Sequence, residues 1–254
     1  MTHNKGTKLV LHARIPIFEN LTLNVRTTGN DATGGLDRPF RQPQAAIDWA
    51  MANLDFQNVR SLTIDIGSGT YSRMEIVNSA QGLHDIIITG NNPTINTVYI
   101  FTDNEVIFNN VTLNATGSNH ALHVTKGYVS IEGSLRITGN TTGFGIHLYT
   151  LAFLQSIGNA SLNITGTFNI MMRVVYGCVT RLTNSTLTFS GTATSSTIET
   201  IYNGIVHLSG NTFAGTVTGR RFSCLLRGVL ITGGVSGSIP GSIAGTTDAS
   251  SFTT

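Results

Sequence analysis

The sequence predicts an all-β protein, specifically a right-handed, single-stranded parallel β-helix with a short capping helix near its N-terminus. Three observations predict it. An apolar phrase ending in Thr/Ser-Gly recurs along the chain, the polar positions are filled by Thr, Ser, Asn and Gly, and only 11% of the 254 residues are charged. Few helices can be surfaced with so little charge, whereas turn-dense β proteins have this composition.

The repeat is the strongest of the three observations. The phrase apolar-x-apolar-Thr/Ser-Gly, with looser copies, ends at six glycines whose numbers differ successively by 27, 22, 27, 25 and 28: Gly90, Gly117, Gly139, Gly166, Gly191 and Gly219. Each period holds two or three short alternating strands separated by turns. A unit of this size cannot bury its apolar face alone, so equivalent strands are expected to stack in parallel about 4.8 Å apart.

Two ladders of apolar side chains are expected inside the coil, with asparagines at its corners. The first ladder comprises Leu113, Leu135, Leu162, Leu187 and Phe213, and the second comprises Ile137, Ile164 and Phe189. A leucine-rich repeat is disfavoured because its fixed Leu-x-x-Leu-x-Leu pattern is absent. A propeller is disfavoured because a blade needs roughly 40 residues.

One short helix is predicted from Pro43 to Leu54. Apolar residues recur there at helical spacing after a loop rich in Gly, Asn and Asp, and proline is tolerated at the first helical position. The first coil of a solenoid exposes an apolar cross-section and unpaired strand edges. We therefore expect this helix to cover that end.

Motifs at both ends of the chain resemble a known family. "GND…GGLDRPFRQPQAAID" and "SLTIDIGSGTYSRMEI" resemble the beginning of pectate-lyase-like β-helix domains, and the Gly-Asn-Asp version is similar to bacteriophage and prophage tail fibre proteins. "GTVTGRRFSCLLRGVLITGG" and "SIPGSIAGTTDASSF" resemble the closing segments of such appendages. The family usually carries Thr-Ile where this chain has Gln42-Pro43. The resemblance implies a virion component at the host-facing end of a tail, forming a homotrimer.

Four segments are expected along the chain. They are an N-terminal attachment segment (1–24) that binds other tail or baseplate proteins, a turn-rich loop with the capping helix (25–60), the parallel β-helix (61–235) and a C-terminal closing segment (236–254). The first full coil is expected to start with the strand at 61–71.

Charge and hydropathy narrow the partners and the location. The formal charge is +2, and the basic residues are scattered, so no nucleic-acid partner is expected. No apolar run approaches the roughly 20 residues that cross a bilayer, and the start of the chain has a shorter apolar stretch than a signal peptide needs. We expect synthesis in the host cytoplasm, residence in the virion and no membrane insertion.

No catalytic, cofactor-binding or metal site is predicted. The segment from Asp31 to Asp37 is not a calcium loop, because Thr33 and Gly35 stand where Asp or Asn is required. The seven histidines, including His147 and His207, show no spacing suited to zinc and are expected to be solvated or hydrogen-bonded.

The two cysteines, Cys178 and Cys224, lie about two coils apart by the repeat. That separation is beyond disulfide reach, so both are expected to be core thiols.

Two surface features keep alternatives open. Six tyrosines recur at near-coil intervals, which suits a saccharide groove, packing at coil edges, or packing between subunits: Tyr71, Tyr99, Tyr128, Tyr149, Tyr176 and Tyr202. Near the end of the chain, Arg220, Arg221 and Arg227 are suited either to an anionic glycan or to pairing across a trimer axis.

Three function classes follow. The preferred one is a structural tail fibre that binds a bacterial surface polysaccharide as host receptor and is not an enzyme. The alternatives are a tailspike-type polysaccharide depolymerase (glycosidase or lyase) and a non-viral carbohydrate-binding β-helix.

The acidic residues favour the non-enzymatic class. Glycoside hydrolysis needs two carboxylates within about 5–9.5 Å. Ten of the thirteen acidic residues lie at or before Glu105, and beyond it Glu132 and Glu199 are expected three coils apart. A site between subunits, where Glu132 of one chain meets a carboxylate of another, stays open.

Overall fold

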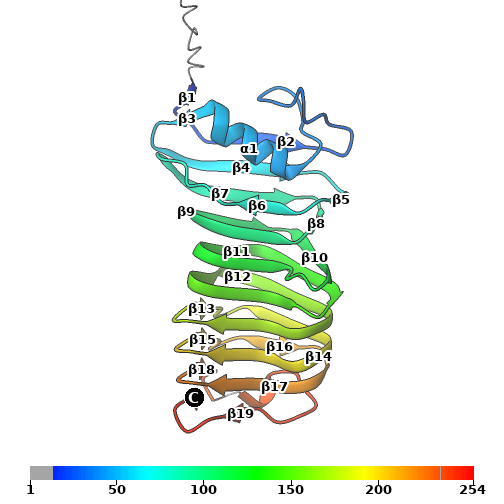
Figure 1. Ribbon diagram of the computed structural model, residues 1–254, viewed down its shortest axis with the longest axis vertical. Helices are drawn as coiled ribbons and strands as arrows, with labels where there is room; N and C mark the ends of the chain where they lie inside the picture. Colours follow the sequence, from blue (N-terminus) through cyan, green and yellow to red (C-terminus); the bar gives the residue numbers. More distant parts are fainter. Residues whose placement is uncertain (1–13, 235) are drawn as a thin grey trace, which may run out of the picture.

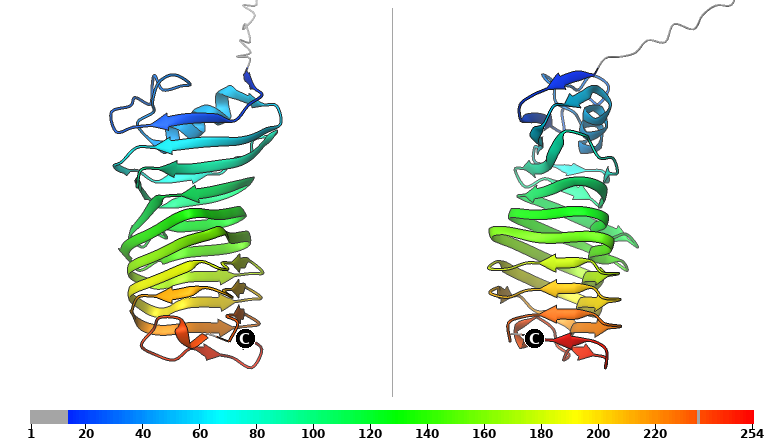
Figure 2. Two further views of the ribbon diagram at one scale, coloured as in Figure 1. Left: turned by 180° about the vertical axis from the view of Figure 1, so that it is seen from behind. Right: turned by 90° about the vertical axis from the view of Figure 1, so that its left-hand side faces the viewer.

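The computed structural model describes residues 14–234 and 236–254, which form a parallel β-solenoid of about 8 turns (Figure 1). Strand accounts for 62% and helix for 6%, so the predicted all-β class and the parallel β-helix are confirmed. The coils stack along the long axis of the molecule, with the N-terminal and C-terminal segments at opposite ends (Figure 2). Within the described ranges, no helix is both long and apolar enough to cross a membrane.

Register divides the coil into three parallel faces. The first face contains β2 (Leu21–Val25), β4 (Val59–Ile66), β7 (Leu83–Gly90), β13 (Val179–Arg181), β15 (Ile205–His207), β18 (Val229–Ile231) and β20 (Phe252–Thr253). The second face contains β5 (Thr70–Tyr71), β8 (Thr94–Asn96), β10 (Val111–Gly117) and β16 (Thr212–Ala214). The third face contains β6 (Met74–Ile76) and β19 (Thr246–Thr247).

Five longer strands turn corners and serve more than one face: β9 (Val98–Asn109), β11 (Leu122–Thr141), β12 (Phe144–Val175), β14 (Thr186–Ile201) and β17 (Val217–Leu225). Because every pairing within these faces is parallel, a residue lies one coil above its partner.

The N-terminal end contains the helix α1 (Pro43–Asn53), which packs against β2, β4 and β6 (Figure 1). It begins at Pro43 as predicted and buries Pro43, Ala46, Ile47 and Ala50. A separate short ladder pairs β1 (Ile15–Ile17) with β3 (Leu54–Phe56). β2 pairs with β4, so part of the segment set apart as 1–24 adds a strand to the solenoid ahead of its first full coil.

Two glutamines join α1 to the strands below it. The Ser72 backbone N–H donates to Gln42 Oε1 at 3.1 Å. The Gln44 amide accepts from the Glu75 backbone N–H at 2.5 Å and donates to the Glu75 carbonyl at 3.1 Å. A side-chain amide thus takes the place of a neighbouring strand at the edge of β6.

The two apolar ladders form, with one correction. Leu135, Leu162, Leu187 and Phe213 pair in register as predicted. Leu113, however, pairs with Ile137 and so belongs to the second ladder, while Val111 is the partner of Leu135.

The glycine anchors explain the error. Gly139, Gly166 and Gly191 are true equivalents, and a Cβ on Gly166 would lie only 1.9 Å from the Gly139 carbonyl oxygen. Gly117 instead pairs with Thr141, and Gly90 lies on the first face opposite Ile66. Coil lengths vary, so counting from each glycine misplaced Leu113 by two residues.

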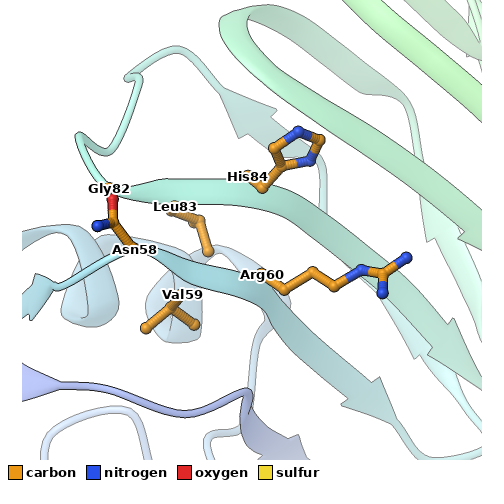
Figure 3. A pocket seen from close by; sticks show the side chains of 6 residues that line it. All are labelled: Asn58, Val59, Arg60, Gly82, Leu83 and His84. Atoms are coloured by element: carbon orange, nitrogen blue, oxygen red, sulfur yellow. The ribbon is translucent and has the colours of Figure 1, made fainter.

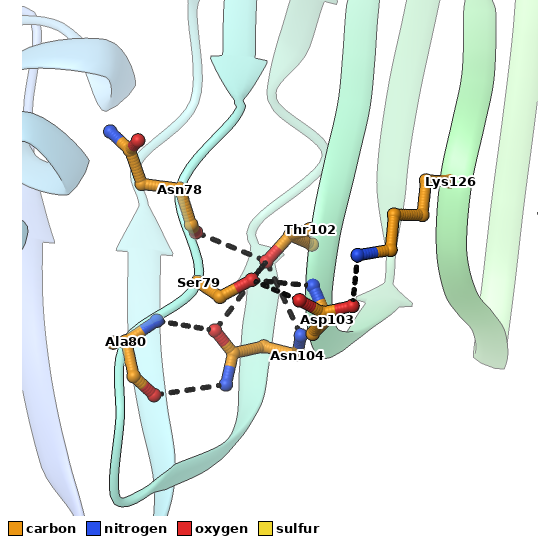
Figure 4. Close-up of polar contacts among 7 residues, drawn as sticks. All are labelled: Asn78, Ser79, Ala80, Thr102, Asp103, Asn104 and Lys126. Atoms are coloured by element: carbon orange, nitrogen blue, oxygen red, sulfur yellow. Dashed lines mark hydrogen bonds and ion pairs between the residues drawn. The ribbon is translucent and has the colours of Figure 1, made fainter.

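Buried asparagines hold two of the corners, as predicted for this residue type. Asn104 accepts from the Ala80 backbone N–H at 2.8 Å and donates to the Leu83 carbonyl at 2.6 Å (Figure 4). Asn211 repeats this arrangement, since it accepts from the Ser185 N–H at 2.8 Å and donates to the Leu182 carbonyl at 2.6 Å. Each side chain satisfies backbone groups that the turn leaves without a strand partner.

Both cysteines are buried and unpaired, so the expectation of core thiols is confirmed. Burial raises the pKa of each thiol.

Replacing Asn104 by Ala is expected to lower the free energy of unfolding by about 2–3 kcal/mol, because it leaves the Ala80 N–H and the Leu83 carbonyl unsatisfied in a buried corner. Urea unfolding measures the loss. Asn91→Ala, at an exposed position in another turn, is the control and is expected to stay near wild type. Equal losses in the two variants would contradict the corner role.

Candidate functional site

A column of polar and aromatic side chains runs along the third face. Glu75, Tyr99, His123 and His147 pair in register from β6 to β12. Further along the same face, Arg173 pairs with Glu199. Alternate residues of a strand point to one side, so these side chains lie outside the core and line up along the solenoid.

Three histidines meet in this column. Nitrogen atoms of His120, His123 and His147 all lie within 4.8 Å of one another. The His123 and His147 rings stack with centroids 4.8 Å apart, and His120 meets His147 edge to face at 4.9 Å. The ring of Phe144 stacks on His120 at 4.7 Å, so aromatic carbon closes one side of the cluster.

Burial leaves these rings neutral at pH 7. Desolvation, followed by the charges of neighbouring His123 and Arg173, lowers the pKa of His120 to about 4. Desolvation and the neighbouring histidines lower the pKa of His147 to about 3. Both nitrogens of His147 are buried and have no hydrogen-bond partner, although the residue is only 8% exposed.

Two ion pairs flank the histidines. Arg173 Nε donates to Glu199 Oε1 at 2.7 Å, and the Arg173 guanidinium lies 4.9 Å from the Phe144 ring centroid. At the other end Arg73 pairs with Glu75 at 2.7 Å. A cavity of about 210 Å³ opens beside the cluster and is lined by Arg73, Thr97, Tyr99, Ser118, Asn119, His120 and His123.

Sequence reasoning missed this cluster, and its expectation for His147 was wrong, because this ring is neither solvated nor hydrogen-bonded. His123 and His147 are separated by one whole coil in the sequence, and only the register of β11 and β12 brings them together. The signal that would have found them is a constant step of 24 residues from Glu75 through Tyr99 and His123 to His147.

The six tyrosines do not form one groove. Tyr71 is buried in the core, whereas Tyr99 contacts His123. Tyr149, Tyr176 and Tyr202 form an exposed ladder, in which the last two rings stack at 4.9 Å and 1°. Because these rings cover one another's faces, the ladder favours packing at coil edges over sugar stacking.

The acidic residues are distributed in a way that sequence reasoning only partly foresaw. Glu132 pairs with Ile157 and Glu199 with Arg173, which places the two carboxylates on different faces. Asp85 and Glu105, which had been grouped with the early acidic residues, pair in register on the first face. His84 Nδ1 lies 2.6 Å from Asp85 Oδ1, which raises the pKa of His84.

A larger cavity of about 570 Å³ lies at the N-terminal side of this pair. It is lined by Asn58, Val59, Arg60, Gly82, Leu83 and His84 (Figure 3). Arg60 and His84 belong to neighbouring strands β4 and β7 of the first face. The carboxylate pair is therefore adjacent to a concave surface that carries basic side chains.

The remaining sequence candidates have local structural roles. Asp31 Oδ1 accepts from the backbone N–H groups of Arg41 and Gln42 at 2.7 and 2.9 Å, in keeping with a turn residue. Arg220 donates to Thr246 Oγ1 and Arg221 to the Gly241 carbonyl, so both hold the C-terminal segment against the last coils. Arg227 contacts the same segment through its backbone N–H, which donates to Ser250 Oγ.

No family model, curated protein or solved structure matches this chain.

The lowered pKa values of His120 and His147 predict that stability falls as the pH is lowered from about 6.5 toward 4. Over this range the unfolded chain binds protons that the folded chain excludes, so protonation favours unfolding. Thermal unfolding in the presence of a chelator, measured across this range, tests the prediction. His147→Phe is expected to flatten the decline of Tm with pH, whereas His207→Phe, on the first face, keeps it. A decline of equal steepness in both variants would argue against the cluster.

Proposed function

We propose that this chain is a structural, host-receptor-binding component of a bacteriophage tail fibre that assembles as a homotrimer. The main support is a strip of exposed apolar side chains along the corner between the third and first faces. This corner strip consists of Val77, Phe101, Tyr149, Leu151, Tyr176, Tyr202 and Leu226. Their exposed fractions range from 39% for Tyr149 to 73% for Leu151.

The corner strip continues from coil to coil. Phe101 and Leu151 both pair with Lys126 of the intervening coil. Farther along, the Tyr149 and Tyr176 rings lie 5.0 Å apart, and the Asn203 N–H, next to Tyr202, donates to the Leu226 carbonyl. Soluble monomers rarely expose contiguous apolar surface of this kind, so the strip is suited to contact with another protein.

A second copy of the same chain fits the strip best. Exposed apolar side chains recur at each coil, with a rise of about 4.8 Å. A copy related by rotation about an axis parallel to the solenoid has the same rise, so its side chains meet those of the first chain coil by coil. Closed rotational symmetry then buries the strip without an open-ended filament, and the resemblance to tail fibres selects three copies.

Binding of surface polysaccharide is supported by the third face. The small cavity beside Tyr99 brings an aromatic ring, the Asn119 amide and the Arg73 guanidinium to one concave surface. Saccharide sites typically combine an aromatic surface with polar donors and acceptors of this type. The attachment of residues 1–13 to other tail or baseplate proteins lies outside the described residues.

The proposal includes a right-handed coil and a capping role for α1. Crossover connections between parallel strands are almost always right-handed. The Gln42 and Gln44 contacts to Ser72 and Glu75 support the capping role, since they satisfy edge groups that a further chain would otherwise pair with.

Leu151→Asp is expected to convert the trimer to a 27.1 kDa monomer without unfolding the coil, because a charge at a 73% exposed position is tolerated in water but not in an apolar interface. Light scattering after size exclusion measures the mass. Ile157→Asp is the control, since Ile157 lies on the same strand, β12, at the next corner and is 40% exposed. A monomeric wild type, or equal effects of both variants, would rule out the strip as the interface.

A polysaccharide depolymerase is the second candidate, because Asp85 and Glu105 lie on adjacent strands beside a cavity. The spacing of adjacent strands, about 4.8 Å, is close to the carboxylate separation of about 5–5.5 Å in retaining glycosidases. We rank it second because Asp85 is only 8% exposed and is engaged by His84.

Incubation of the trimer with capsules from a panel of bacteria separates the two functions. We expect binding to at least one capsule, weakened by Tyr99→Ala, with no new reducing ends or unsaturated sugar. Absence of binding across the panel would count against the receptor role. Depolymerisation that disappears in Asp85→Asn or Glu105→Gln would establish the second candidate. Loss on Glu132→Gln instead would place the active site between subunits.

A further inference from the structure

We propose that His120, His123 and His147 form a binding site for a first-row transition-metal ion, with zinc as its preferred occupant. The site lies outside the proposed subunit interface and goes beyond the proposed function. The three residues come from two successive coils, because His120 and His123 lie at the start of β11 and His147 lies on β12.

The geometry is the first support for this inference. One nitrogen from each ring lies within 4.8 Å of the other two. Nitrogen atoms bound to one tetrahedral zinc ion at about 2.0–2.1 Å are about 3.4 Å apart. Closing the site therefore requires the rings to approach by up to about 1.4 Å, which side-chain rotation can supply.

The state of His147 is the second, independent support. Its side chain lies against the other two rings, it is 8% exposed, and neither ring nitrogen has a hydrogen-bond partner. A buried polar atom without a partner is costly, and native structures contain few. A metal ion between the three rings gives one of these nitrogens a partner.

The ligand type selects the class of ion. Three imidazoles without a carboxylate are suited to zinc, copper, nickel or iron and not to magnesium or calcium, which require oxygen ligands. The lowered pKa values of all three rings keep them in the neutral form that binds metal. Nearby positive charge is offset, since Arg73 pairs with Glu75 and Arg173 with Glu199.

His120 is expected to form the weakest of the three bonds. Its Nδ1 accepts from the Phe144 backbone N–H at 3.0 Å. Ligation through Nδ1 must displace this amide, whereas ligation through Nε2 requires loss of the Nε2 proton. His123 has only a contact of 3.5 Å between Nε2 and Thr125 Oγ1. No carboxylate orients the rings among the described residues, so binding weaker than in a structural zinc site is expected.

Calorimetric titration of zinc chloride into the chelator-treated full-length chain tests the proposal. We expect one zinc ion per chain, a rise in Tm on loading, and no comparable effect of magnesium. Cobalt in the same site is expected to give the visible absorption bands of a tetrahedral nitrogen-ligated ion. A folded wild-type chain that binds neither zinc nor cobalt would overturn the proposal.

Variants locate the ion. His147→Phe and His123→Phe are each expected to weaken zinc binding by more than about tenfold, while His207→Phe leaves it unchanged. Circular dichroism verifies that each variant is folded, and the half-buried His123 provides the test if His147→Phe is not. Undiminished binding by folded His123→Phe would assign the zinc to other residues, including His3 and His12 outside the described range, and reject the site. Zinc binding is read without host cells or capsule, so its failure is distinguishable from failure of the receptor role.

Discussion

Parallel pairing between successive coils, at a rise of about 4.8 Å, is the constraint on which the rest of this molecule depends. It converts a separation of 24 residues in sequence into direct contact in space, as between His123 and His147. The same rule stacks leucine on leucine inside the core and tyrosine on tyrosine at the corner. The ladders fix the fold from within, which leaves the outward positions free to carry a histidine column on one face and an apolar strip at one corner.

A solenoid held by this pairing has two open ends, and each is closed by different chemistry. At the N-terminal end, the Gln44 amide takes up both backbone groups of Glu75, so a side chain replaces the missing strand. At the C-terminal end, Thr246 pairs with Ser223 and Phe252 with Val229, so the segment expected only to close the coil adds strands to it. Asp248 reinforces this end by accepting from the Leu226 N–H at 2.6 Å, and this hydrogen bond is the main cause of its pKa of about 2.

The core was more predictable from sequence than the surface, for a physical reason. Leu135, Leu162 and Leu187 could be aligned because the glycines that follow them must be small where the backbones of successive coils approach closely. Leu113 was misplaced because Gly117 has no such equivalent and pairs with Thr141. The start of α1 was predictable from proline and helical spacing, but the glutamine contacts that join it to the strands depend on tertiary position.

The candidate sites could not be predicted because surface positions tolerate any coil length. Asp85 and Glu105 are only 20 residues apart, while Arg173 and Glu199 are 26 apart, and both pairs are in register. A search with one fixed period finds at most one of them. In a sequence whose core residues agree with the fold at every level, a buried histidine without hydrogen bonds is a local conflict. Such conflicts concentrate at functional sites, because selection retains them only when a ligand, ion or partner repays the cost in stability. His147 is the residue of the third face where this conflict is sharpest, which is why the metal-binding test is centred on it.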